Sequence, residues 1–147
     1  VFRIGGYYVV SRLLEGEFLD YNAAIPKVSK TTVKINTRSL TDAVERTSLL
    51  ISDRLRSPIR LSAMDQKVQL NCSTSMGKAH DEVDCEMSGE AVSMGFNNKY
   101  LMDALKASDC DMVKLEINGA LSPMRILPLE GESFLFLVLP VRVKNDD

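Results

Sequence analysis

The sequence has few of the residues on which catalysis and metal binding usually depend. Its 147 residues contain one histidine, His80, and three cysteines, Cys72, Cys85 and Cys110, without the CxxC spacing of a zinc or redox motif. His80 has no second ligand at metal-binding spacing, and no glycine-rich phosphate-binding loop is present. We therefore expect no metal ion, no cofactor and no catalytic centre.

Long apolar runs and an excess of basic residues are also absent. No run reaches the length of about 18 residues that a transmembrane helix needs, and no signal peptide is recognisable. An odd number of scattered cysteines is typical of a reducing compartment, so we expect a cytoplasmic protein without a membrane segment. The formal net charge is −2, whereas tight nucleic-acid binders are usually basic. Any contact with DNA should therefore be local or weak.

Hydrophobic residues make up 45% of the sequence, which is enough for the core of one domain, or of one domain and part of another. Residues 1–14 predict a β-hairpin that turns at Gly5-Gly6, and residues 15–30 predict an irregular connector. Because the chain begins at Val1, inside a strand-like run, we expect it to be a piece of a longer protein.

The remaining residues predict an α+β domain in which one unit of strand, helix and three strands occurs twice. The first unit is expected as a strand over 31–36, a helix capped by Thr37 or Ser39 and ending near Ile51, and strands over 59–63, 67–74 and 80–87. After a turn at 88–90, the second unit is expected as a strand over 91–96, a helix from Asn97 or Asn98 to about 107, and strands over 112–117, 122–127 and 134–143.

The two units are also similar in sequence, since INTRSLTDAV at 35–44 aligns with FNNKYLMDAL at 96–105. A unit of this kind leaves one sheet face bare, and pairing two of them buries it. The repeat therefore predicts a pseudo-twofold domain with two helices side by side, backed by antiparallel sheet. Chance similarity over ten residues is the alternative.

The C-terminal run FLFLVLPVRV, at 134–143, is almost wholly apolar and does not alternate. Such a run is buried on both faces, or leaves one face as an apolar groove. We expect its first half to be a core strand. Pro140 has no N–H for a ladder, so pairing is expected to stop there, and the end of the run is either core or the wall of an exposed pocket.

Charged residues allow two interpretations. Basic side chains on or near the two helices could face DNA phosphates, or could be ordinary solvated charges, which the nearby Asp42, Glu45 and Asp103 favour. The acidic residues at 81, 82, 84 and 86 alternate with Val83 and Cys85, as on the solvated face of a strand. An enzyme built around His80 and this acidic strand stays a weaker hypothesis.

Four stretches resemble the β subunit of bacterial DNA polymerase III, the β sliding clamp: LLEGEFLDYNAAIP at 13–26, TRSLTDAVERTSLLI at 37–51, GFNNKYLMDALKA at 95–107 and FLFLVLPVRV at 134–143. The resemblance implies the α+β DNA-clamp fold. It places residues 1–15 in the last hairpin of the family's middle domain, 16–26 in a connector and 27–147 in the third domain. It also implies a non-catalytic processivity factor, in which two chains close head to tail around double-stranded DNA. The alternative is a generic α+β interaction module without a DNA role.

The resemblance further implies a hydrophobic pocket, between the middle and third domains, for short linear motifs of the polymerase alpha subunit, the clamp loader and repair proteins. Its implied residues are Leu19, Ala23, Ala24, Asn97, Tyr100, Leu121, Pro123, Leu137, Val138, Leu139, Pro140, Val141 and Arg142. The implied DNA-facing residues are Arg38, Arg46, Arg54, Lys99 and Lys106, and the implied subunit-interface residues are Leu49 and Leu50. Leu19 stands where the family often has proline and Ala23 where arginine is common, so partner preference is left open.

Overall fold

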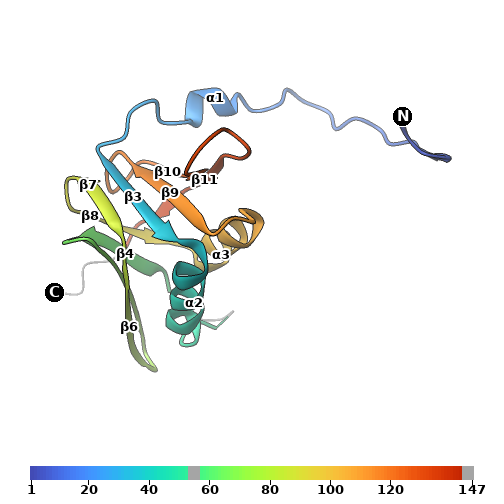
Figure 1. The fold of residues 1–147 in the computed structure, drawn as a ribbon. Coiled ribbons are helices and arrows are strands. Elements are labelled where there is room, and N and C mark those ends of the chain that lie inside the picture. The colour runs from blue at the N-terminus through green and yellow to red at the C-terminus, as the bar shows by residue number, and fades with distance from the viewer. Residues whose placement is uncertain (53–56, 144–147) are drawn as a thin grey trace.

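The N-terminal hairpin stands apart from the folded domain. The computed structural model describes residues 1–52 and 57–143. Strands β1 (Phe2–Ile4) and β2 (Tyr7–Val9) pair around Gly5, which has a φ of 58°. All six strand residues are exposed, and Figure 1 shows the hairpin at the end of an extended segment. The hairpin was predicted correctly, whereas the connector contains one unpredicted helical turn, α1 (Tyr21–Ala24), capped by the Asp20 side chain.

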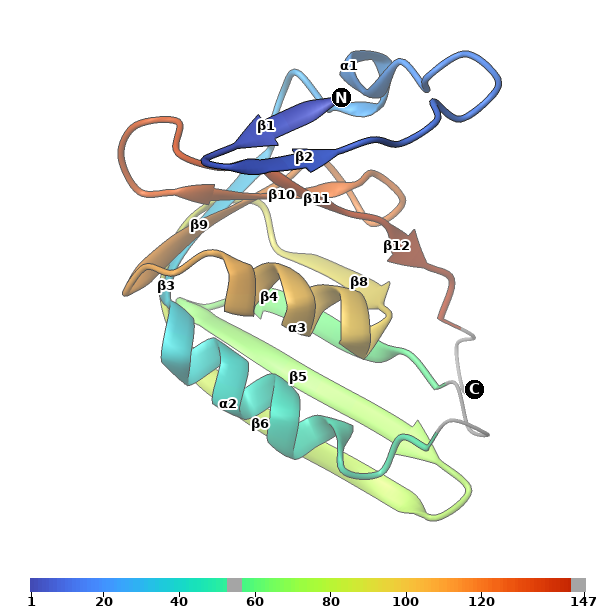
Figure 2. The same ribbon diagram turned by 90° about the vertical axis from the view of Figure 1, so that its right-hand side faces the viewer.

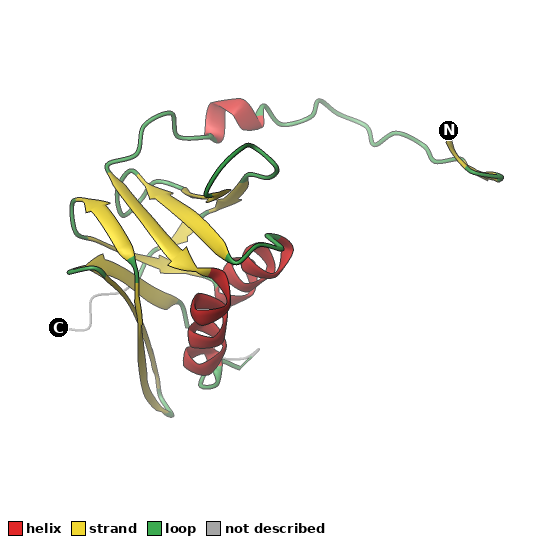
Figure 3. Ribbon diagram, viewed as in Figure 1, coloured by secondary structure: helices red, strands yellow, loops and turns green. Residues whose placement is uncertain are grey.

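Two longer helices, α2 (Thr37–Ser48) and α3 (Asn98–Ala107), lie side by side on one face of the domain (Figures 2 and 3). The cap of α2 is Asn36, one residue before Thr37 and three before Ser39. Its Oδ1 accepts a hydrogen bond from Ser39 N at 2.9 Å, which satisfies a free N–H of the first turn. In α3, Asn97 does the same for Lys99 N at 2.9 Å. Helix α2 ends at Ser48, before the predicted Ile51.

Two five-stranded antiparallel sheets lie behind the helices. The first sheet has the order β11-β10-β9-β3-β7 and the second β12-β8-β4-β5-β6. The strands of the first sheet are β3 (Thr31–Asn36), β7 (Glu86–Gly89), β9 (Met112–Ile117), β10 (Met124–Pro128) and β11 (Phe136–Val138). Those of the second are β4 (Ile59–Met64), β5 (Lys67–Thr74), β6 (Gly77–Asp84), β8 (Val92–Phe96) and β12 (Pro140–Val141).

The predicted duplication is confirmed by the strand order. If β3, α2, β4, β5, β6 and β7 are matched to β8, α3, β9, β10, β11 and β12, the order of one sheet becomes the order of the other. The first and last strands of each unit lie in the sheet formed by the middle strands of the other unit. The units therefore interlock, and neither sheet is complete without both.

Two predicted strands are each broken into two, because each unit ends by passing from one sheet to the other. The run predicted over 80–87 divides at Cys85 into β6 and β7, so Ser88 and Gly89 belong to a strand and not to a turn. The C-terminal run divides at Leu139 into β11 and β12. Pairing does not stop at Pro140 as expected: it changes sheet there, and the edge position of β12 tolerates the missing N–H.

The hydrophobic core lies between the two sheets and under the helices. The largest fully buried side chains are Phe96, Ile35, Leu40, Ile59, Leu61, Leu70, Leu101, Leu105, Leu115, Ile117, Met124 and Ile126. The first half of the C-terminal run is less buried than predicted, since only Val138 is fully buried and Leu135 is exposed. Within the described residues, no helix is both long and apolar enough to cross a membrane.

Candidate functional site

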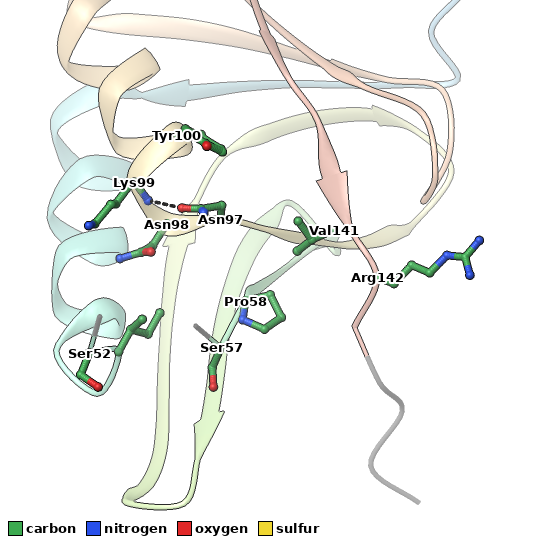
Figure 4. Close-up of a pocket in the computed structure, with 10 residues that line it drawn as sticks. Ser52, Ser57, Pro58, Asn97, Asn98, Lys99, Tyr100, Val141 and Arg142 are labelled. Carbon is green, nitrogen blue, oxygen red and sulfur yellow. Dashed lines mark hydrogen bonds between the residues drawn. The ribbon is translucent and has the colours of Figure 1, made fainter. Parts of the chain in front are cut away.

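Helix α3 and the C-terminal strand β12 meet at a hollowed surface. A cavity of about 690 Å³ lies here, lined by Asn97 and Tyr100 from the start of α3, by Val141 and Arg142, and by Pro58 at the entrance to β4. Figure 4 shows Tyr100 and Val141 on the cavity wall and the Arg142 side chain pointing outward. The cap of α3 fixes this wall, because the Asn97 side chain is held on Lys99 N.

An apolar groove of about 730 Å³ continues along the other side of Tyr100. One wall is the face of α3 formed by Tyr100, Ala104 and Ala107, and the other is the C-terminal run from Leu135 to Val141. Tyr100 is 65% exposed and Leu139 62% exposed. Contiguous exposed apolar side chains of this size are uncommon unless a partner covers them. The groove can therefore bury apolar anchors of a ligand.

The local sequence explains how β12 reaches this position. Val141 lies opposite Gly95 of β8, and a Cβ on Gly95 would lie 2.2 Å from Val143 Cγ2 and 2.7 Å from the Val141 carbonyl oxygen. Only glycine allows the C-terminal segment to approach the sheet this closely. The break at Leu139 turns that side chain outward while Val138 stays buried.

The structure brings together nine of the thirteen residues that the resemblance assigned to a peptide pocket. Asn97, Tyr100, Leu121, Leu137, Val138, Leu139, Pro140, Val141 and Arg142 line the adjoining cavities at this surface. Leu19, Ala23 and Ala24 lie on the exposed connector and α1 and line none of them, nor does the half-buried Pro123. The pocket residues that were missed include Ala104 and Ala107. They follow Tyr100 at helical spacings of four and seven, a stripe that could have identified them.

The predicted DNA-facing residues are dispersed along the helix face. Arg38, Lys99 and Lys106 are exposed on α2 and α3. Arg46 is instead directed at β6, where its Nε donates to Asp81 Oδ2 at 2.7 Å. This hydrogen bond is the main cause of the lowered pKa of the Asp81 carboxyl group. Arg54 lies outside the described residues. Two acidic residues on α2 accompany its two basic ones, so this face is not strongly positive.

The two predicted interface leucines differ. Leu49 is the C-cap of α2 and is 80% exposed. Leu50 is half-buried, and its Cδ1 lies 4.0 Å from where a Cβ on Gly77 of β6 would stand. Leu50 therefore packs within the domain, and Leu49 is left for a partner surface.

The residues proposed for an enzyme site show no arrangement for chemistry. His80 is exposed, with its Nδ1 2.8 Å from Asn71 Oδ1. Burial raises the pKa of the Cys72 and Cys85 thiols, which lowers the fraction of reactive thiolate. In the part of the chain that the structure describes, no three His, Cys, Asp or Glu side chains are grouped to hold a metal ion.

Residues 22–142 match the protein family described as DNA polymerase III beta subunit, C-terminal domain. The chain belongs to this family. It is 35% identical over 144 residues to the beta sliding clamp of Staphylococcus aureus, an alignment that covers 97% of the chain and 38% of the relative. The chain thus spans well under half the length of the curated relatives it matches.

Solved structures of the family have the same fold. The DNA polymerase sliding clamp of Bacillus subtilis superposes with a TM-score of 0.85 at 31% identity, over 91% of this chain and 36% of that one. The DNA polymerase III beta subunit of Thermotoga maritima gives a TM-score of 0.85 at 28% identity, over 90% and 36%. The predicted clamp fold is confirmed.

Proposed function

We propose that this chain forms part of a cytoplasmic DNA sliding clamp, a non-catalytic ring subunit that tethers a replicative polymerase to double-stranded DNA. Residues 27–147 would be its third domain, residues 16–26 the connector and residues 1–15 the last hairpin of its middle domain. The fully exposed hairpin supports this assignment, because an isolated two-stranded hairpin is marginal in water and fits as the edge of a larger sheet.

The observation that carries the proposal is the exposed apolar groove between α3 and the C-terminal run, in a domain of the clamp family. An extended peptide with leucine and phenylalanine anchors would bury its side chains against Tyr100, Leu137 and Leu139. Such anchors belong to short motifs in a polymerase alpha subunit, a clamp loader or a repair protein. Each buried anchor contributes about 1.5–3 kcal/mol, so a few anchors give micromolar affinity.

The side-by-side helices supply a surface for DNA without strong binding. Arg38 on α2 and Lys99 and Lys106 on α3 are exposed, and acidic residues lie on the same two helices. Weak attraction is what a ring that slides requires, since each tight phosphate contact would slow translocation. Retention would then come from topology and would not require a positively charged protein, which agrees with the net charge of −2.

Ring closure would use the β6 edge of the second sheet. Strand β6 is its edge strand, with eight residues from Gly77 to Asp84 and one row of unpaired backbone groups. An exposed edge of this length is a template for pairing with another chain, and the exposed Leu49 lies on the helix that packs on β6. A head-to-tail dimer that extends the sheet across β6 would cover both.

Peptide binding tests the groove. Fluorescence anisotropy with a labelled peptide that carries leucine and phenylalanine anchors should show saturable binding. Leu139→Asp places a charge in the apolar groove and Tyr100→Ala removes its central wall, so each should weaken binding at least about tenfold. Leu129→Asp, an exposed apolar position outside the groove, is the matched control. Unchanged affinity in both groove variants would remove the groove from the proposal.

A further inference from the structure

The hollowed surface does not end at Arg142. Arg142 lines the cavity beside Tyr100 and also a cavity of about 360 Å³ next to Gly95 and another of about 770 Å³ on the outer face of the second sheet. The largest of the three crosses β4, β5 and β6, and its wall includes Arg60, Lys78 and His80. The three adjoining cavities form one trough that begins at the peptide groove.

Strand pairing fixes the course of this trough. Val141 lies opposite Gly95, Gly95 opposite Arg60, Arg60 opposite Asn71, and Asn71 opposite His80. These five residues form one row across all five strands, with their side-chain positions on the outer face. Because Gly95 has no side chain, Val143 lies directly on the sheet there, and Arg142 and Arg60 line the same two cavities.

The trough is positively charged. Among the described residues that line its three cavities, none is an aspartate or a glutamate. Arg60, Lys78 and Arg142 make no ion pair with any residue in the described ranges. Another basic side chain on the same sheet face is neutralised, since Lys67 pairs with Glu82. A chain with 20 acidic and 18 basic residues thus gathers three such cations along one trough.

We infer that this trough binds acidic residues that flank the apolar anchors of a docked peptide. The inference rests on the proposed peptide-binding function and adds a preference to it. Four strand spacings of about 4.8 Å separate β12 from β6, and an extended peptide advances about 3.3 Å per residue. A flank of roughly six residues would therefore reach from Arg142 to Lys78.

A peptide fits the trough better than a nucleic acid does. The trough is continuous with the apolar groove, and it lies on the outer sheet face, whereas the helices occupy the opposite side of that sheet (Figure 2). No phenylalanine, tyrosine or tryptophan side chain lines the cavity over β4, β5 and β6. Among the described residues, the His80 imidazole is the one ring there on which a base could stack, whereas single-strand binders use several. The basic side chains of the trough therefore favour the carboxylates of a peptide.

The test compares three labelled peptides that share the same leucine and phenylalanine anchors and differ in a six-residue flank of glutamate, serine or lysine, placed at either end. At low salt the glutamate flank at one end should bind about fivefold tighter than serine, and lysine more weakly. The advantage should disappear at high salt. The double variant Arg60→Ser with Lys78→Ser should abolish the advantage of the glutamate flank without changing the affinity of the serine peptide. The single variant Lys78→Glu, which reverses one exposed charge, should reduce the advantage.

Lys30→Ser with Lys34→Ser removes two exposed positive charges outside the trough and should preserve the advantage. If the serine peptide binds but glutamate adds nothing at either end, the inference fails and the proposed function stands. If no peptide binds, both fail. If a dT12 oligonucleotide binds more tightly than the glutamate peptide and loses its affinity in Arg60→Ser with Lys78→Ser, the trough is a nucleic-acid site and the inference is overturned.

Discussion

Val141 of β12 lies directly opposite Gly95 of β8, and this pair holds the C-terminal segment against the domain. A Cβ at position 95 would lie 2.7 Å from the Val141 carbonyl oxygen, which is backbone and cannot rotate away. Gly95→Ala should therefore displace β12. Because Val141 and Arg142 line the cavity beside Tyr100, we expect peptide affinity to fall about tenfold. Anisotropy measures this, and the cooperative thermal transition should remain, since β4, β5 and β6 do not depend on β12. Unaltered affinity would show that β12 does not position the groove.

Asn36 and Asn97 are equivalent caps in the two repeats, which makes them a matched pair for separating stability from binding. Each accepts a hydrogen bond from a first-turn N–H at 2.9 Å. Replacing either by alanine should cost about 1 kcal/mol in the free energy of unfolding, measured by urea denaturation. Only Asn97→Ala should also weaken peptide binding, because Asn97 lines the cavity and Asn36 does not. Equal effects of both variants on binding would contradict this assignment.

Leu49 provides a test of subunit contact. It is 80% exposed at the end of α2, so a polar substitution there should cost little folding stability. Leu49→Glu should change the free energy of unfolding by no more than an ordinary surface substitution does, about 0.5 kcal/mol. It should weaken ring dimerisation, measured by sedimentation with the full ring subunit. Leu50→Glu, at a half-buried position, should instead lower the midpoint. A stable dimer in the Leu49→Glu variant would exclude Leu49 from the interface.

The Arg46–Asp81 pair links stability to pH. The hydrogen bond from Arg46 lowers the pKa of Asp81 below its ordinary value of 3.8. A carboxyl group whose pKa is lowered by folding stabilises the native state above its ordinary pKa, and this contribution is lost as the pH falls through the lowered value. Asp81→Asn should thus lower the melting temperature at pH 7. The difference in melting temperature between this variant and the unsubstituted chain should shrink below about pH 4.

The Arg46→Met variant is the control for this pH dependence. In its background the Asp81→Asn substitution should have little effect on the melting temperature at pH 7. A pH-independent effect of Asp81→Asn in both backgrounds would show that the pair does not act through charge.

The repeat made much of the fold predictable from the sequence. The match of Asn36, Leu40 and Ala43 to Asn97, Leu101 and Ala104 located both helices, since capping and burial recur at the same spacing. The breaks at Cys85 and Leu139 could not be predicted. The alternation of charged and apolar residues continues through Cys85, and the apolar run continues through Leu139, while the hydrogen-bond partners change at both positions.

The candidate site divides in the same way. Residues on regular elements, such as Tyr100 and Leu137, are brought together as the resemblance implied. Leu19 and Ala23 are not, because the connector that holds them is exposed from residue 13 to residue 24 and packs little against the domain. Arg46 could not be assigned from its helix position alone, since its partner Asp81 lies 35 residues further along the chain.

Retention on DNA is the measurement that decides whether this chain belongs to a topological tether, as proposed. The full ring subunit, loaded on nicked circular DNA and separated by gel filtration, should stay with the circle in moderate salt and be released when a restriction enzyme linearises it. Blocking both ends of the linear DNA with bulky protein should restore retention. Equal release from circular and linear DNA, or retention that depends on salt alone, would show that the protein is not held on DNA by topology.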